Sequence, residues 1–203
     1  LLTTMPEWLS AASGLDALTH GIEAYVSLAH NPLADVHALS AARRAVASNP
    51  SVLGIHLEGP FLSPQRPGVH NPAVFRVPND EDAAQLIAAR AGAMLVTLAP
   101  ERTPPGFIRK LAAVGIRVSL GHSAATYEQA KAGIEAGVRY GTHLFNAMPT
   151  LLHRDPGLPG ALLTDPRPVV GLIADGVHTH PAIVSLAWQA LGTRRMNLVT
   201  DGL

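Results

Sequence analysis

The alternation of apolar and polar positions changes character near residue 51. Beyond this point, short apolar runs alternate with longer segments whose apolar residues recur at helical spacing. We expect six strands, at residues 52–57, 93–98, 116–120, 139–144, 169–174 and 197–200. Because strands that alternate with helices are joined by right-handed crossovers, this pattern predicts a parallel sheet in an α/β fold.

Helices are expected in the intervals between the strands. The predicted ranges are 80–91, 105–114, 126–136 and 181–191, with a short helical turn at 160–164. Glycine commonly ends a helix because it adopts left-handed backbone without steric strain. Four glycines lie at the expected helix ends and support these boundaries, namely Gly92, Gly115, Gly137 and Gly192.

The first part of the chain has helical periodicity and no strand pattern. We expect one helix over residues 9–28 and a second over residues 32–46. The chain is therefore predicted to consist of a helical segment, residues 1–45, followed by an α/β domain, residues 46–203. It begins LLTTMPEW, without an initiator Met or a signal-peptide pattern, which predicts an internal fragment.

Composition limits the partners and cofactors of the chain. Its 203 residues are 47% apolar and include 15 basic and 15 acidic side chains, so no broad charge attracts nucleic acid or an anionic membrane. The most apolar window, residues 83–100, is interrupted by Gln85 and Arg90 and is too short to span a bilayer. The chain lacks cysteine, so a metal would need His, Asp or Glu ligands, and a cytoplasmic location is expected.

Titratable residues follow most of the predicted strands. They are Glu58, His122, His143, Asp175 with the nearby His178, and Asp201. The carboxyl ends of parallel strands meet at one edge of a sheet, where (β/α)₈ barrels carry their active sites. Each histidine taken alone would be interpreted as a structural hydrogen-bonding residue, but their joint placement favours a metal site.

Four stretches resemble one enzyme family, the N-acetylglucosamine-6-phosphate deacetylases, which are metal-dependent amidohydrolases. They are GIHLEGPFLSPQRPGVHNP, the long run from GHSAATYEQ to GLPGAL, GLIADGVHTHP and LVTDG, within about residues 45–203. The resemblance implies removal of the acetyl group from N-acetylglucosamine 6-phosphate, giving glucosamine 6-phosphate and acetate. It also implies a TIM-type barrel, here incomplete because only six strands are predicted where a closed barrel needs eight.

The resemblance further implies the roles of individual residues. Glu58, His122 and His143 would hold one divalent cation, zinc or iron, and leave a position open for water. Asp201 matches the catalytic aspartate, which takes a proton from the attacking water and delivers it to the departing amine. His70 would help the metal polarise the acetamide carbonyl. The alternatives are a helix N-cap for Asp201 and a backbone-bonded loop histidine for His70.

The residues matching the family's substrate contacts form a second set. They are Val69, His70, Asn146, Ala147, Arg154 and His178. Arg154 and His178 would anchor the phosphate, because a guanidinium group forms paired hydrogen bonds with it. The arginine loop lies at a dimer contact in this family, so a homodimer is expected. The alternative for Arg154 is a solvated surface role, and we interpret His153 and His180 as structural.

Residues 1–40 resemble a different family. SGLDALTHGIEAYVSLAHNPLADVHAL is similar to the metal-binding helix of iron-dependent alcohol dehydrogenases. There, the residues matching Asp16 and His20, four apart on one helical face, are two of four metal ligands; a simple surface hydrogen bond is the alternative. A dehydrogenase is therefore the second hypothesis, although no glycine-rich phosphate loop follows a strand. A fragment that binds metal or sugar phosphate without turnover is the third.

Overall fold

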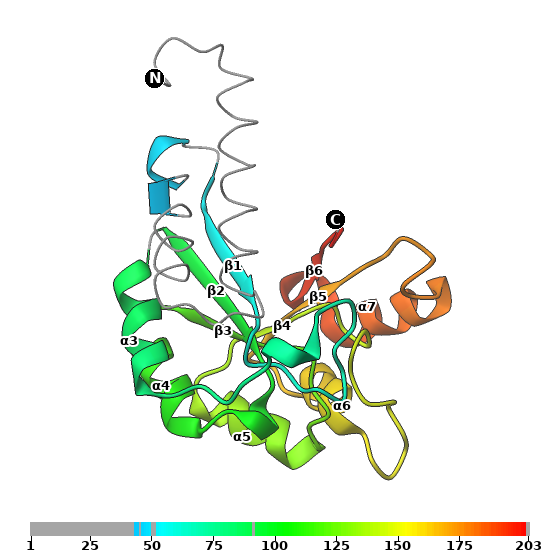
Figure 1. Ribbon diagram of the computed structural model, residues 1–203. Helices are drawn as coiled ribbons and strands as arrows, with labels where there is room; N and C mark the ends of the chain where they lie inside the picture. Colours follow the sequence, from blue (N-terminus) through cyan, green and yellow to red (C-terminus); the bar gives the residue numbers. More distant parts are fainter. Residues whose placement is uncertain (1–42, 45, 50–51, 91, 202–203) are drawn as a thin grey trace.

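The computed structural model describes residues 43–44, 46–49, 52–90 and 92–201 and contains one parallel sheet. Its strands are β1 (Gly54–Glu58), β2 (Ala93–Leu98), β3 (Arg117–Leu120), β4 (Tyr140–Gly141), β5 (Val169–Leu172) and β6 (Met196–Leu198). Each strand pairs in parallel with the next one along the chain. The sheet curls into part of a barrel, which confirms the predicted incomplete TIM-type architecture (Figure 1).

Helices follow the strands and cover the convex face of the sheet (Figure 1). They are α3 (Asp80–Ala89), α4 (Pro105–Ala113), α5 (Tyr127–Ala136), α6 (Gly157–Thr164) and α7 (Pro181–Arg195), with short 3-10 helices η2 (Pro72–Val74) and η3 (Pro100–Arg102). Capping boxes begin α3 and α5, where Asn79 and Thr126 accept hydrogen bonds from the third residue of each helix. These caps satisfy backbone donors that a helix leaves free at its start.

The hydrophobic core lies between the sheet and its helices. Successive side chains of a strand point to opposite faces, so Ile55 and Leu57 of β1 are buried against the helices. His56 and Glu58 therefore point to the concave face, which is the interior of the partial barrel. The same alternation brings chemistry-bearing side chains of several strands to one face of the sheet.

Most predicted elements are confirmed, but the predicted strand at 139–144 is wrong in length. Strand β4 covers only Tyr140–Gly141, because His143 and Phe145 have left-handed φ angles of 29° and 75°. Such angles cannot continue an extended strand. The predicted turn at 160–164 is instead the longer helix α6, and α7 is broken at Gly192, where φ is 63°.

Several predictions concern the first 42 residues, which lie outside the described part of the chain. They include the helices at 9–28 and 32–46, apart from the helical residues 43–44 and 46–48, and the pair Asp16 and His20. The boundary between segments 1–45 and 46–203 stays a prediction. Among the described residues, every helix is too short or too polar to cross a lipid bilayer.

Candidate metal centre

Three side chains from separate strands meet at the carboxyl edge of the sheet. Glu58 ends β1, His122 follows β3 and His143 follows β4. The Nε2 atoms of His122 and His143 lie 3.2 Å and 3.1 Å from Glu58 Oε1, and 3.0 Å from each other. The structure therefore brings together the residues that the sequence predicted to share one cation.

The spacing and the protonation of these atoms fit a divalent cation. Ligands about 2.0–2.1 Å from a tetrahedral zinc ion lie roughly 3.3 Å apart, close to the distances found here. His122 Nδ1 donates to the Arg66 carbonyl at 3.0 Å, so the Nε2 atom of the neutral ring presents a lone pair to Glu58 Oε1. Glu58 Oε1 is a buried oxygen without a hydrogen-bond donor among the described residues. Lone pairs that face one another in this way suit a shared cation.

The charges at this centre favour an ionised carboxylate. Burial raises the pKa of Glu58, but the facing rings of His122 and His143 lower it by a larger amount. The pKa of Glu58 therefore lies well below its usual range. Burial lowers the pKa of His143, yet the close carboxylate of Glu58 raises it above its ordinary value. A carboxylate with two imidazoles is a donor set that zinc and iron both accept.

Unusual backbone conformations aim the two histidines inward. His122 and His143 have φ angles of 46° and 29°, which are uncommon for residues other than glycine. The chain also approaches itself closely here, since a Cβ atom on Gly121 would lie 2.9 Å from side-chain atoms of Thr97 and Thr142. Glycine at 121 thus lets the end of β3 fit between its neighbours. Strained backbone of this kind is typical of functional sites.

His70 lies on the loop between β1 and η2, beside the triad of Glu58, His122 and His143. Its Nε2 atom is 3.9 Å from Glu58 Oε2, and its ring centroid is 4.7 Å from that of His122. Burial and the neighbouring His122 lower its pKa, which favours the neutral ring. Ligand atoms of Glu58, His70 and His122 all lie within 4.8 Å of one another. The Nε2 atom of His143 lies closer to the Glu58 carboxylate than that of His70 does, at 3.1 Å against 3.9 Å, and this favours His143 as the third ligand.

Asp201 lies just beyond β6 and is exposed. Burial and Glu58 have the largest effects on the pKa of His143, and the charge of the Asp201 carboxylate raises that pKa by a smaller amount. It acts in the same direction on His70, where burial is the largest influence. Asp201 follows the carboxyl end of β6, and the triad lies at the same carboxyl edge of the parallel sheet. Its catalytic role stays a prediction.

Among the predicted substrate residues, Asn146 and Ala147 lie nearest in sequence to a triad member. Both are half-buried in the loop after His143, and Ala147 has a left-handed φ of 49°. The Ala147 carbonyl accepts a hydrogen bond from the Ser123 backbone N–H at 3.1 Å. This contact ties the loop after β4 to the loop after β3.

The remaining predicted substrate residues lie on exposed loops. Val69 has an exposed fraction of 81%, and Arg154 is exposed in the loop before α6. His178 Nδ1 lies 2.7 Å from Asp175 Oδ2, and this contact lowers the pKa of Asp175 to about 2. His180 caps α7 by accepting from the Ala182 N–H, which fits the structural role predicted for it.

A chain of polar side chains on the concave face of the sheet was not predicted from the sequence. His56 Nε2 lies 2.7 Å from Thr97 Oγ1, which is 2.8 Å from Thr142 Oγ1, which in turn is 2.6 Å from Ser119 Oγ. The signal was present in the two-residue spacing of His56 and Glu58, which puts both on one face of β1. These groups lie one layer below the triad.

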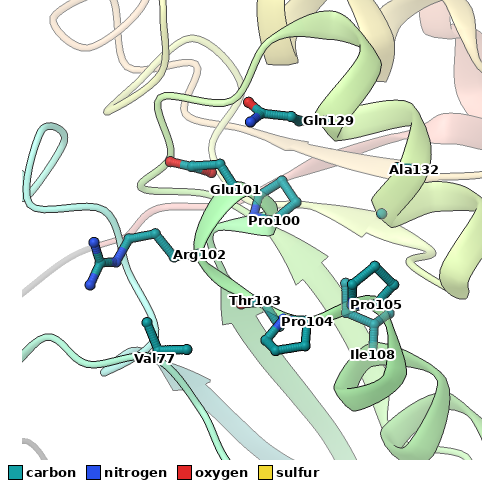
Figure 2. Close-up of a pocket in the computed structure, with 11 residues that line it drawn as sticks. Val77, Pro100, Glu101, Arg102, Thr103, Pro104, Pro105, Ile108, Gln129 and Ala132 are labelled. Carbon is teal, nitrogen blue, oxygen red and sulfur yellow. The ribbon is translucent and has the colours of Figure 1, made fainter.

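A pocket of about 410 Å³ lies elsewhere, beside η3, α4 and α5 (Figure 2). Its walls include Pro100, Pro104, Pro105 and Ile108, and no member of the triad lines it. The chemistry-bearing residues therefore gather at the sheet edge and not in this pocket.

Known proteins resemble the chain over most of its length. The model of the amidohydrolase family matches residues 6–199. An N-acetylgalactosamine-6-phosphate deacetylase of Shewanella sp. (strain ANA-3) is 40% identical over 174 residues, which are 83% of this chain and 44% of that protein. An N-acetylglucosamine-6-phosphate deacetylase of Danio rerio is 39% identical over 199 residues, or 92% of this chain and 49% of the relative. The chain thus spans about half the length of these relatives.

A solved structure shows the same fold. The N-acetyl-D-glucosamine-6-phosphate deacetylase of Mycobacterium smegmatis, in a mutant complex with N-acetyl-D-glucosamine-6-phosphate, has a TM-score of 0.80 and 38% identity. The match covers 85% of this chain and 46% of that one. The comparisons do not support the resemblance of residues 1–40 to alcohol dehydrogenases. The family match and the shared fold both support the resemblance to N-acetylglucosamine-6-phosphate deacetylases. The chain belongs to the amidohydrolase family.

Proposed function

We propose that the chain removes the acetyl group from N-acetylglucosamine 6-phosphate, giving glucosamine 6-phosphate and acetate. The observation that carries this proposal is the meeting of Glu58 Oε1 with the Nε2 atoms of His122 and His143. A carboxylate and two imidazoles form the donor set that an amide-hydrolysing metal centre requires. The deacetylase relatives and the shared fold support the same reaction.

In this proposal Glu58, His122 and His143 hold zinc or iron. When bound, the ion would lower the pKa of a bound water molecule and would polarise the substrate carbonyl. Asp201 accepts a proton from the attacking water and then gives that proton to the amine nitrogen as the C–N bond breaks. His70, as a neutral ring, donates a hydrogen bond to the acetamide oxygen while negative charge develops there.

The sugar phosphate is bound by the second predicted set of residues. Arg154 and His178 anchor the phosphate, because both carry N–H donors and lie on exposed loops that a dianion can reach. Val69, Asn146 and Ala147 contact the remainder of the substrate from the loops after β1 and β4. A homodimer and a cytoplasmic location belong to the same proposal. Exposed Leu151 and Leu152, close to Arg154 in sequence, support a subunit contact at this loop.

An acetate-release assay on the purified, zinc-loaded chain tests the proposal. We expect acetate from N-acetylglucosamine 6-phosphate, loss of turnover after chelation, and recovery when zinc or ferrous ion is restored. Because relatives carry either sugar in their names, N-acetylgalactosamine 6-phosphate is assayed in parallel. Faster turnover of the galactose epimer would reassign the substrate, and turnover unaffected by chelation would contradict the metal-dependent reaction.

A binding fragment without turnover is the second candidate. Calorimetry with the same sugar phosphate separates the two functions. Binding of substrate to the zinc-loaded chain without acetate release would assign the fragment function, whereas release of acetate would exclude it.

A further inference from the structure

Glu101 is an acidic residue outside the triad, and both of its carboxylate oxygens accept hydrogen bonds from the loop after β3. It lies on η3, directly after β2, and in Figure 2 its carboxylate extends away from Pro104 and Pro105. Ser123 Oγ–H donates to Glu101 Oε2 at 2.7 Å, and the Ala124 backbone N–H donates to Oε1 at 2.7 Å. Hydrogen bonds to a charged acceptor are stronger than those between neutral groups.

Ser123 connects this carboxylate to the rest of the site. Its side chain is completely buried, and Ser123 Oγ also accepts from the Ala125 backbone N–H at 3.0 Å. The Ser123 backbone N–H donates to the Ala147 carbonyl at 3.1 Å. One serine thereby joins η3, the loop after β3 and the loop after β4.

The residue before Ser123 is the triad member His122, whose backbone is strained. Its φ of 46° is uncommon for a residue other than glycine and is held by neighbouring contacts. On one side, the His122 carbonyl accepts from the Ser63 N–H at 2.8 Å. On the other side, the contacts of Glu101 with Ser123 and Ala124 fix the two residues that follow.

We propose that Glu101 is a positioning residue for the cation site, acting through Ser123 on the backbone of His122. The inference deepens the proposed function and rests on it, because it takes His122 as a ligand. Glu101 touches no member of the triad. Its effect is to keep the His122 ring aimed at Glu58 before a cation binds. Residues that orient metal ligands typically change metal affinity by about 10- to 100-fold when they are substituted.

The test is the zinc dissociation constant, measured on the whole chain by competition with a chromogenic chelator. We expect Glu101→Ala to weaken zinc binding about 10- to 100-fold, and Ser123→Ala to do the same. The variant that carries both substitutions should bind zinc as tightly as Glu101→Ala alone, because both changes break one connected set of contacts. Glu101→Gln keeps an acceptor for the Ala124 N–H and should lose less. Glu128→Ala, on the exposed surface of α5, is the matched control.

Thermal unfolding of the metal-free variants separates positioning from general stability. If Glu101→Ala does not fold, Ser123→Ala carries the test by itself. Zinc constants within twofold of the unsubstituted chain for the folded variants would overturn the inference and leave the proposed function intact. An unsubstituted chain that binds no zinc would overturn both. A visible spectrum of the cobalt-loaded Ser123→Ala variant that differs from that of the unsubstituted chain would support altered ligand geometry.

Discussion

The proposed metal side of the site, formed by Glu58, His122 and His143, is closely packed at strand ends, whereas Val69, Arg154 and His178 of the proposed substrate side lie on exposed loops. Both histidines of the triad are at least 95% buried, and the ligand atoms lie 3.0–3.2 Å apart. Arg154 and Val69, on the substrate side, are exposed. A cation thus meets a preorganised donor set, while a sugar phosphate must organise much of its own contact surface.

This difference has a physical origin in the fold. Triad members lie at strand ends, where backbone hydrogen bonds between neighbouring strands fix the positions of the Cα atoms. The substrate residues lie in longer connections, where fewer contacts define the backbone. Substitutions on the two sides should therefore affect different measurements.

The largest effect is expected for Glu58→Ala, which removes the charged ligand. Three ligands share a metal-binding free energy on the order of 10 kcal/mol, so losing one should weaken zinc binding by on the order of 10³-fold. Equilibrium dialysis followed by metal analysis measures this loss. Glu81→Ala, an exposed residue of α3, should bind zinc like the unsubstituted chain. Normal zinc binding by Glu58→Ala would remove the ligand assignment.

Asp201→Asn should separate catalysis from metal binding. The amide cannot accept the proton of the attacking water, so turnover should fall by about 10³-fold. Zinc content should stay unchanged, because Asp201 is not a ligand in this account. Steady-state kinetics combined with metal analysis checks both statements. Near-normal turnover would contradict the role given to Asp201.

Arg154→Ala probes the substrate side alone. Loss of a hydrogen bond from a charged group to phosphate costs about 1.5–3 kcal/mol, which corresponds to roughly 10- to 100-fold in kcat/KM. The loss should occur with the phosphorylated sugar and not with N-acetylglucosamine. His153→Ala, next to it on the same exposed loop, is the matched control. An equal loss with both sugars would exclude a phosphate contact.

The smallest effect on the site is expected from a substitution in the charge cluster of Asp165, Lys131 and Arg167. This cluster lies near the amino-terminal end of β5, at the edge of the sheet opposite the triad. Asp165 is buried in the connection between α6 and β5, where it accepts from Lys131 Nζ at 2.5 Å and from Arg167 Nη2 at 2.6 Å. Asp165→Asn should lower the free energy of unfolding by about 2 kcal/mol, since it removes the negative charge that faces Lys131 and Arg167, although Arg167 keeps its pair with Glu135. Zinc affinity should not change. A parallel loss of zinc affinity would show that the two edges are coupled.

The same cluster predicts a dependence of stability on pH. The hydrogen bond from Arg167 is the largest cause that holds the pKa of Asp165 below its ordinary value. Because the folded-state pKa is lower than the unfolded value, the stabilisation is present above about pH 4 and is lost as pH falls below it. Denaturant titrations of the metal-free chain at pH 6 and pH 3 measure this loss. The loss should be smaller in Asp165→Asn.

The meeting of Glu58, His122 and His143 could be predicted from strand periodicity, which placed all three at the carboxyl ends of strands in one parallel sheet. Their role as metal ligands stays a prediction. The short β4 could not be predicted, because nothing in the local sequence signals the left-handed φ of His143. The contact of Glu101 with Ser123 was also out of reach, since it joins residues 22 positions apart through a loop. For Val69 and Arg154, the family resemblance was the only guide, whereas His178 also stood out by its place after the predicted fifth strand.

Anomalous diffraction from crystals of the zinc-loaded chain, recorded at the zinc absorption edge, tests the central claim most directly. The account predicts one strong peak about 2.0–2.2 Å from Glu58 Oε1, His122 Nε2 and His143 Nε2. A peak bound by other residues, or zinc-saturated crystals with no peak between these three atoms, would contradict it.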